Sequence, residues 1–287
     1  MKPLVQAFFD KATNTISYLV SDPDMKAAVL IDPVLDFDPA AFRTSTAGAD
    51  AILTAAADGG LTIERVLETH AHADHLSAAH YIRGRTGARI GIGGRITEVQ
   101  KTFGDLFEAD DVTDDGAVFD QLFADGDRFG IGGLEAEVMH TPGHTPACVS
   151  YRIGDAVFVG DTLFMPDYGT ARTDFPGGDA ATLYRSIQRI LALPDATRLF
   201  VGHDYIPETG RTDFAWETTV GEQRRANIHV GAGVEEDAFV ARRTARDAVL
   251  GAPRLILPSL QVNIRAGALP PAEASGRRFM KLPLNAL

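Results

Sequence analysis

The segment Thr69-His70-Ala71-His72-Ala73-Asp74-His75 places three histidines and an aspartate within six residues. Imidazole nitrogens and carboxylate oxygens are the ligands that zinc, iron and manganese bind in proteins. The segment lies between an apolar stretch, expected to be a strand, and an expected helix. Side chains two residues apart at the end of a strand lie on one face and can reach one ion. Asp74 alone could cap the helix, but core packing does not account for the whole cluster, which indicates a metal site.

Three later segments place further ligand types directly after expected strands. The turn Pro142-Gly143 directs His144 into a loop, whereas His140 is expected to stay a strand residue. An apolar strand ends at Asp161, where a buried carboxylate is costly unless it is paired or bound to a metal. Another short strand precedes His203. Because the functional residues of layered α/β proteins gather at strand ends, we expect these side chains to join the histidine cluster.

Strands and helices are mixed along the whole chain, and they predict an α/β layered domain. The Gly-rich residues 84–94 and the acidic residues 108–120 are expected to be irregular, and the chain ends in a Pro-rich tail. By apolar periodicity and flanking turn residues, strands are expected at 4–9, 15–20, 27–31, 65–69, 134–139, 147–153, 156–159 and 199–201, and helices at 50–58, 74–85, 95–107, 179–193, 216–227 and 235–250.

Composition excludes several classes of function. The 287 residues carry a formal net charge of −12, which argues against binding to a nucleic-acid backbone. Cys148 is the single cysteine, so no internal disulfide or multi-cysteine zinc site can form, and it is expected to be a small buried hydrophobe. No apolar stretch is long enough for a membrane span, and the N-terminus lacks the features of a secretory signal. A cytoplasmic protein with no membrane contact is therefore expected.

The ordered ligand set resembles that of the metallo-β-lactamase superfamily. The resemblance implies an αββα sandwich over residues 1–210, with residues 211–287 as a C-terminal helical extension packed on the same domain. For a binuclear member it implies that one metal is held by three histidines, a second by an aspartate and two histidines, and that one carboxylate is shared: His70, His72 and His144, then Asp74, His75 and His203, with Asp161 between them.

The segment Arg172-Thr173-Asp174-Phe175 is similar to the persulfide dioxygenase branch of that superfamily, as are residues 203–205, 217–223 and 262–267. Thr170 departs from the branch, which often has cysteine there, and glyoxalase II usually has glutamate where this chain has Asp204. The branch implies one Fe(II) per chain and oxidation of glutathione persulfide, or a similar small persulfide, by O2 to sulfite in sulfide detoxification. The implied iron ligands are His70, His144 and Asp161, with His72, Asp74, His75 and His203 orienting water and ligands around them.

Two side chains are candidates for substrate binding. Arg172 could bind a substrate carboxylate, or it could form a structural pair with Asp174. Tyr205 could line the pocket or simply pack. The persulfide and O2 are the expected partners. The C-terminal helices could pack on the core or form the contact of a homodimer.

Two other functions remain open. All seven ligand types of a binuclear zinc hydrolase of the glyoxalase II kind are present, with one or two zinc ions and a bridging hydroxide as nucleophile. A metal-binding protein without catalysis, acting as a sensor or sulfur carrier, is the third reading. As a carrier it would need Cys148 to be exposed and reactive.

Overall fold

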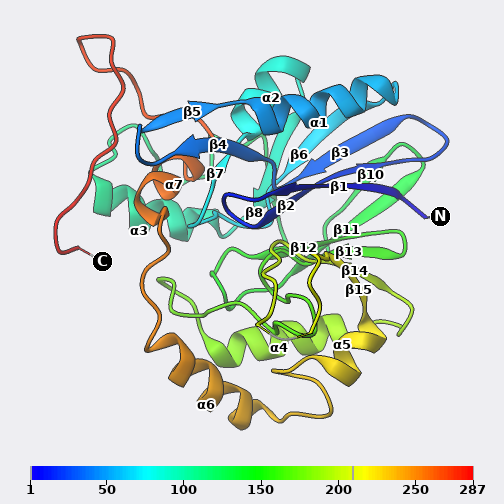
Figure 1. Cartoon of the computed structure of the whole chain (residues 1–287). Helices are drawn as coiled ribbons and strands as arrows, with labels where there is room; N and C mark the ends of the chain where they lie inside the picture. The colour runs from blue at the N-terminus through cyan, green and yellow to red at the C-terminus, as the bar shows by residue number, and fades with distance from the viewer. Residues whose placement is uncertain (1, 209, 287) are drawn as a thin grey trace.

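The computed structural model describes residues 2–208 and 210–286. Two six-stranded sheets pack face to face, and helices cover the outer face of each (Figure 1). The first sheet has the order β1 (Leu4–Asp10), β2 (Thr15–Ser21), β3 (Ala27–Ile31), β6 (Thr62–Leu67), β8 (Arg89–Gly93) and β9 (Gln121–Phe123). The second has the order β10 (Arg128–Ile131), β11 (Leu134–His140), β12 (Val149–Ile153), β13 (Ala156–Phe158), β14 (Arg198–Phe200) and β15 (Glu217–Thr219).

The helices divide between the two outer faces. On the first sheet lie α1 (Ala47–Asp58), α2 (Ala79–Thr86), α3 (Ile96–Phe107) and α7 (Ile256–Asn263), whose apolar side chains share one core with that sheet. On the second lie α4 (Ala180–Leu191), α5 (Val220–Ala226) and α6 (Glu236–Asp247). A small third sheet joins β5 (Arg43–Ser45), β4 (Val34–Asp38) and β7 (Leu76–Ser77). The αββα architecture expected from the sequence is confirmed.

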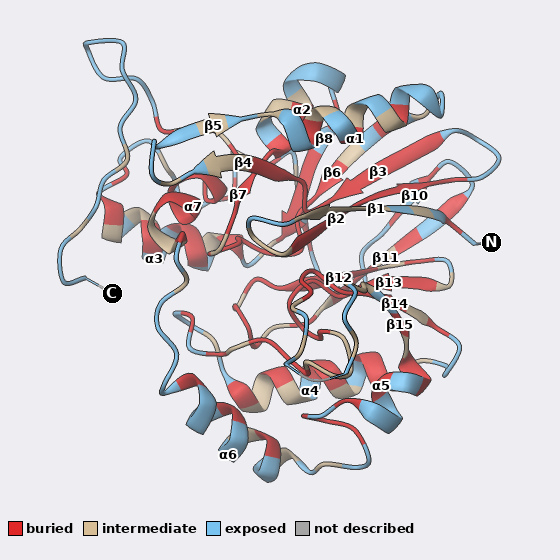
Figure 2. Ribbon diagram, in the orientation of Figure 1, coloured by how far each residue is buried: buried red, intermediate tan, exposed pale blue. Residues whose placement is uncertain are grey.

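Alternation of apolar residues explains why two separate cores form. Successive side chains of a strand point to opposite faces. In β2, Tyr18 and Val20 therefore enter the core between the sheets, whereas Leu19 enters the core under the helices. The strands are buried along most of their length, and the exposed residues lie on the outer helices and the loops (Figure 2). Over the described residues, no helix combines the length and apolar character of a membrane span.

Parallel pairing brings the ends of distant strands to one edge. Strands β3, β6, β8 and β9 run parallel, as do β13 and β14 in the second sheet. Asp32 follows β3 and the segment 68–75 follows β6, while Asp161 and His203 follow β13 and β14. Since the carboxyl ends of parallel strands share one edge, polar residues far apart in sequence meet there.

Several expected boundaries are wrong. The helix expected from residue 74 begins only at Ala79, and Ala78 is its N-cap, so Asp74 does not cap it. Residues 76–77 instead pair with β4, since Leu76 is buried in the core under the helices. The Gly-rich residues 84–94 contain β8, in which Gly93 leaves room for the Ala147 carbonyl. The strand expected at 147–153 begins at Val149.

The C-terminal third also differs from expectation. Residues 217–219 form β15, and the helix begins only after Thr219, whose side chain and that of Glu222 form a capping box. The tail contains α7, which packs beside β7 and α3, whereas α6 packs on α4. The extension therefore contributes to both helical layers. The domain boundary at residue 210 stays a prediction.

The turn before His144 gives a test of how the fold fixes the site. Gly143 has a φ of 130°, and a Cβ there would lie 2.3 Å from the Leu183 nitrogen of α4. We expect Gly143→Ala to lower the free energy of unfolding by about 3 kcal/mol. Gly84 in α2 has nothing within 4 Å of a built Cβ. Gly84→Ala should therefore raise stability by about 0.5–1 kcal/mol. Urea unfolding measures both, and equal effects would contradict this account of the turn.

Candidate metal centre

Seven predicted ligand residues meet at the edge where the strands end. The ligand atoms of His70, His144 and Asp161 lie within 4.8 Å of one another. All three side chains are buried. His144 Nε2 is 3.7 Å from Asp161 Oδ2. Two imidazoles and one carboxylate thus converge on a single point.

A second group contains His72, Asp74, His75 and His203, whose ligand atoms also lie within 4.8 Å of one another. His203 Nε2 is 3.2 Å from Asp74 Oδ2 and 3.4 Å from Asp161 Oδ1. Asp161 therefore lies between the two groups, in the position that the resemblance gave to a shared ligand.

His72 is the residue whose grouping differs from the binuclear assignment. Its ring centroid lies 4.1 Å from that of His70 and 4.1 Å from that of His75, so it stands between the two groups. Its Nε2 is bound to Asp32 and Glu68, which leaves Nδ1 without a partner among the described residues. His72 groups with Asp74, His75 and His203 and not with His70, His144 and Asp161.

Unpartnered buried atoms show that this site fits a cation. Within the described chain, five buried ligand atoms have no hydrogen-bond partner: His70 Nε2, His72 Nδ1, His75 Nε2, His203 Nε2 and Asp161 Oδ1. Leaving buried polar groups unpaired costs about 1–3 kcal/mol each. Nitrogen and carboxylate donors gathered in this way suit zinc or iron. The donor set therefore fits a metal without selecting between the two.

Burial and neighbouring charge set the protonation of these groups. Burial lowers the pKa of His70 well below 6.5, and the surrounding histidines lower it further. Burial also lowers the pKa of His203, but Asp161 and Asp74 outweigh it and raise the pKa above its ordinary value. Burial raises the pKa of Asp74, yet His203 and His75 outweigh it and hold the pKa far below the usual range.

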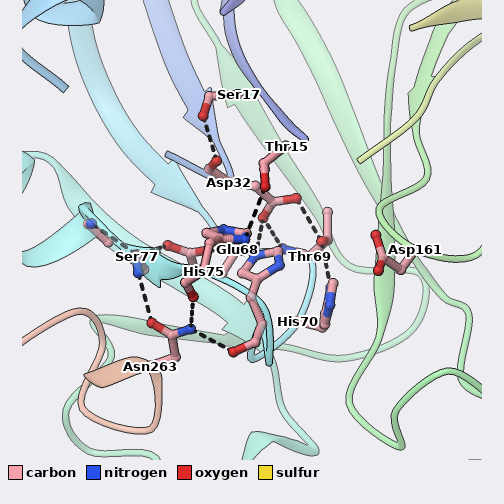
Figure 3. A network of polar contacts seen from close by, with 12 residues as sticks. Thr15, Ser17, Asp32, Glu68, Thr69, His70, His75, Ser77, Asp161 and Asn263 are labelled. Carbon is pink, nitrogen blue, oxygen red and sulfur yellow. Dashed lines mark hydrogen bonds and ion pairs between the residues drawn. The ribbon is translucent and has the colours of Figure 1, made fainter. Parts of the chain in front are cut away.

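His72 contacts a carboxylate pair that the sequence interpretation missed, Asp32 and Glu68. Figure 3 shows these two acids beside the ligand loop. The Asp32 carboxylate accepts hydrogen bonds from the Thr69 backbone N–H and hydroxyl, both at 2.7 Å, and lies 3.1 Å from His72 Nε2. Glu68 lies 3.2 Å from the same nitrogen and accepts a hydrogen bond from Ser77. Burial lowers the pKa of His72, but the two carboxylates outweigh it and raise the pKa well above 6.5. Asp32 follows an apolar strand, the same signal that identified Asp161, whereas Glu68 was expected inside the strand at 65–69.

The other imidazoles are also oriented through the ring nitrogen that faces away from the group. His70 Nδ1 lies 3.0 Å from the Thr69 hydroxyl, and His144 Nδ1 donates to the Arg172 carbonyl at 2.8 Å. His75 Nδ1 and His203 Nδ1 lie 3.3 and 3.4 Å from the hydroxyl of Thr15. Such contacts fix the ring orientation and leave Nε2 available as a ligand.

The C-terminal extension holds the loop that carries three of the ligands. Asn263, the last residue of α7, donates to the carbonyls of His72 and His75, both at 2.8 Å, and accepts from the Ser77 N–H at 2.8 Å (Figure 3). The sequence marked residues 262–267 only as a point of resemblance. Their contact with the ligand loop spans more than 180 residues of sequence, which local patterns do not reveal.

A cavity of about 400 Å³ opens beside the ligands. Asp74, His144 and Asp161 reach it from the ligand groups. The rest of its wall mixes aromatic, aliphatic and cationic side chains, among them Phe37, Phe164, Tyr168, Leu255, Arg246 and Arg254. Cavities of this size suit a small molecule.

Both predicted substrate residues line this cavity. Tyr205 is half-buried and stacks on Tyr168 with ring centroids 4.8 Å apart. Arg172 also forms the structural pair that was the alternative to substrate binding. Its guanidinium donates two hydrogen bonds to the Asp174 carboxylate, both at 2.5 Å. The pair is confirmed, and the substrate contact stays a prediction.

Three further residues, Asp204, Cys148 and His140, have structural positions outside both ligand groups. Asp204 is buried and pairs with Arg211 at 2.6 Å, which fixes the loop after His203. Cys148 is buried, and burial raises the pKa of its thiol to about 12. The expectation of a small buried hydrophobe is confirmed, and an exposed, reactive thiol for a sulfur carrier is excluded. His140 lies at the end of β11 and binds the Pro146 carbonyl, outside both ligand groups.

Comparison with known proteins agrees with this geometry. The family model described as Metallo-beta-lactamase superfamily matches residues 11–203. A beta-lactamase hydrolase-like protein of Xylella fastidiosa is 54% identical over 99% of this chain, and the chain spans 65% of that relative's length. Glyoxylase B2 of Dictyostelium discoideum is 48% identical, with 100% of this chain and 98% of the relative covered.

Relatives described as persulfide dioxygenases also match nearly the whole chain. The human mitochondrial persulfide dioxygenase ETHE1 is 31% identical over 93% of this chain and 90% of its own. The crystal structure of ETHE1 from Myxococcus xanthus superposes with a TM-score of 0.73 and 32% identity, covering 92% of this chain and 100% of that one.

The Asn263 contacts predict a specific loss of metal. Asn263→Ala leaves two buried carbonyls and one N–H without their partner, so we expect the free energy of unfolding to fall by about 2–3 kcal/mol. We also expect metal affinity to fall about tenfold, as measured by competition with a chelator. Gln261→Ala is the matched control, because Gln261 lies on the same helix and binds the tail at Lys281. Equal loss of metal in both variants would show that Asn263 has no special role at the site.

Proposed function

The chain belongs to the metallo-beta-lactamase superfamily, and on this premise we propose that it is an iron-dependent persulfide dioxygenase. Its substrate is glutathione persulfide or a similar small persulfide, which it oxidises with O2 to sulfite. The observation that carries the proposal is the separate convergence of His70, His144 and Asp161 beside the cavity. Two histidines and one carboxylate are the ligand set of non-haem iron oxygenases, in which positions remain open for substrate and O2.

Electron balance requires a redox-active metal for this reaction. Persulfide, O2 and water give thiol, sulfite and two protons, so the outer sulfur loses four electrons and O2 gains them. When bound, iron would supply the redox chemistry that overcomes the slow reaction of triplet O2 with closed-shell sulfur, which zinc does not provide. The residues His70, His144 and Asp161 would hold it.

The chain itself orients the ligands and encloses the substrate. The Arg172 carbonyl fixes His144, so the segment 172–175 acts on the site through its backbone. Asp247 accepts hydrogen bonds from the Thr173 N–H and hydroxyl and anchors that segment to α6. Phe164 and Leu255 provide apolar parts of the cavity wall.

Cationic side chains on the cavity wall support an anionic substrate. Arg246 and Arg254 line the cavity and form no ion pair with any residue that the structure describes. Glutathione persulfide carries two carboxylates, and guanidinium groups bind carboxylates well. A local positive wall also offsets the net charge of −12, which by itself repels such a substrate.

A binuclear zinc hydrolase of the glyoxalase II kind is the second candidate. The complete second group of His72, Asp74, His75 and His203 favours it, as does the similarity to glyoxylase B2 of Dictyostelium discoideum. In that case one or two zinc ions would occupy the site, and Asp161 would lie between two metals.

The proposed localisation is cytoplasmic, and a homodimer is proposed as the assembly.

Oxygen uptake tests the proposed reaction. The protein is loaded with ferrous iron under anaerobic conditions and then given glutathione persulfide in an oxygen electrode. We expect one O2 consumed and one sulfite formed per persulfide, because the balance above requires that ratio. The protein loaded with zinc is the control and should consume none. Absence of oxygen uptake with iron fully loaded would refute the proposal.

His203→Ala separates the two candidate functions. His203 belongs to the second ligand group and lies outside the first. The dioxygenase proposal therefore predicts that the variant keeps about one iron per chain by elemental analysis, whereas a binuclear hydrolase would lose its second zinc. His80→Ala, at an exposed histidine outside both groups, is the control. Release of iron from the His203 variant but not from the control would contradict the three-residue ligand set.

A further inference from the structure

One wall of the cavity carries an imidazole and a guanidinium that the ligand groups do not use. His229 and Arg243 both line the cavity, and both are at least nine-tenths buried. The backbone and side chain of Thr170 bind both of them. They therefore form a fixed pair on the segment that also orients His144.

The position of His229 is fixed from two sides. Its ring Nδ1 accepts a hydrogen bond from the Thr170 N–H at 3.1 Å and lies 3.0 Å from the Thr170 hydroxyl. Its backbone N–H donates to Asn227 Oδ1 at 2.8 Å. Gly169 has a φ of 100°, and a Cβ there would lie 2.3 Å from His229 Nδ1. Only glycine lets the ring approach the backbone so closely.

These contacts determine which ring nitrogen carries the proton. A backbone N–H can only donate, so His229 Nδ1 must be the acceptor and the proton of the neutral ring must be on Nε2. Burial, with the charges of Arg243 and Arg242, lowers the pKa of His229 to about 4, so the ring is neutral near pH 7. Across the described chain, no residue accepts a hydrogen bond from Nε2. His229 is thus a neutral donor on the cavity wall.

Arg243 adds positive charge beside this donor. Its Nη1 donates to the Thr170 carbonyl at 3.2 Å and its Nη2 to Asp247 at 2.5 Å. Its Nε is buried and has no partner among the residues described. Asp247 is committed to Thr173 through its other oxygen. Arg243 is therefore a fixed positive charge beside His229, with one donor that has no acceptor among the described residues.

The arginines that line the cavity favour the binding of an anionic group near His229. The lining carboxylates, Asp74 and Asp161, belong to the ligand groups. Arg246 and Arg254 line the same cavity as His229 and Arg243. An anionic group of the substrate that does not reach the metal site is attracted to these cationic side chains.

We propose that His229 and Arg243 form a carboxylate subsite, in which the His229 Nε2–H donates to a carboxylate of the substrate and the neighbouring arginines add attraction. This inference rests on the proposed function for the identity of the substrate as a glutathione derivative. The subsite holds the peptide end of the substrate and leaves its sulfur end beside His144 and Asp161. His229 is a specificity-determining residue in this arrangement.

Binding of glutathione itself, measured by calorimetry on the whole chain, tests the subsite without relying on oxygen chemistry. We expect His229→Phe to weaken binding about tenfold, because a hydrogen bond to a charged group is lost. His229→Gln, which restores an N–H donor, should bind within about threefold of the wild type. The diethyl ester of glutathione, which lacks both carboxylates, should bind the wild type and His229→Phe equally weakly.

A second pair of variants covers the case in which His229→Phe does not fold. Arg246 lines the cavity, and Arg242 lies on the same helix without lining it and donates to the Ile228 carbonyl. We expect Arg246→Gln to weaken glutathione binding about threefold and Arg242→Gln to leave it unchanged. Wild-type affinity in His229→Phe, equal effects of the two arginine variants, or no binding of glutathione to the wild type would overturn the subsite. Failure of oxygen uptake with this binding intact would refute the dioxygenase alone.

Discussion

The site depends on one buried carboxylate, that of Asp32. It accepts two hydrogen bonds from Thr69 and lies beside His72 Nε2, so it joins the end of β3 to the ligand segment that follows β6. Asp32 has a φ of 48°, a conformation that an L residue adopts at a cost. Burial raises its pKa, but His72 and Thr69 outweigh that effect and hold the pKa below its ordinary value. The Asp32 carboxylate therefore keeps its negative charge at the buried end of β3. It fixes the imidazole of His72, which stands between the two ligand groups.

Contacts from the rest of the fold orient the other ligand side chains. Each ligand imidazole is fixed through the nitrogen that faces away from its group, by Thr15, Thr69, Asp32 with Glu68, or the Arg172 carbonyl. The C-terminal extension adds Asn263 from one helical layer and His229 with Arg243 from the other side of the site. Removal of the extension would therefore leave the ligand residues in sequence but without the contacts that orient their loop and shape the cavity.

Much of the fold and the ligand set could be predicted from the sequence because both depend on local patterns. Apolar alternation predicted most of the strands. Polar residues that follow expected strands predicted His144, Asp161 and His203 as ligands. Asp32 ends an expected strand as Asp161 does, but it was missed because the following Pro33 is typical of a turn, and Glu68 was missed because it was expected inside the strand at 65–69. Asn263 and His229 could not be found, since their roles arise from contacts with residues 59 to 191 positions away. The helix expected from Asp74 failed because pairing of residues 76–77 with β4 overrides helical periodicity.

Two ligand groups within one buried centre raise the question of how many metal ions it holds and of which kind. In the proposed function, His70, His144 and Asp161 hold one ion, and His72, Asp74, His75 and His203 orient its surroundings. Elemental analysis of the protein purified without added metal tests this most directly. The account predicts one iron per chain and little zinc. Two zinc ions per chain, with no iron, would contradict it.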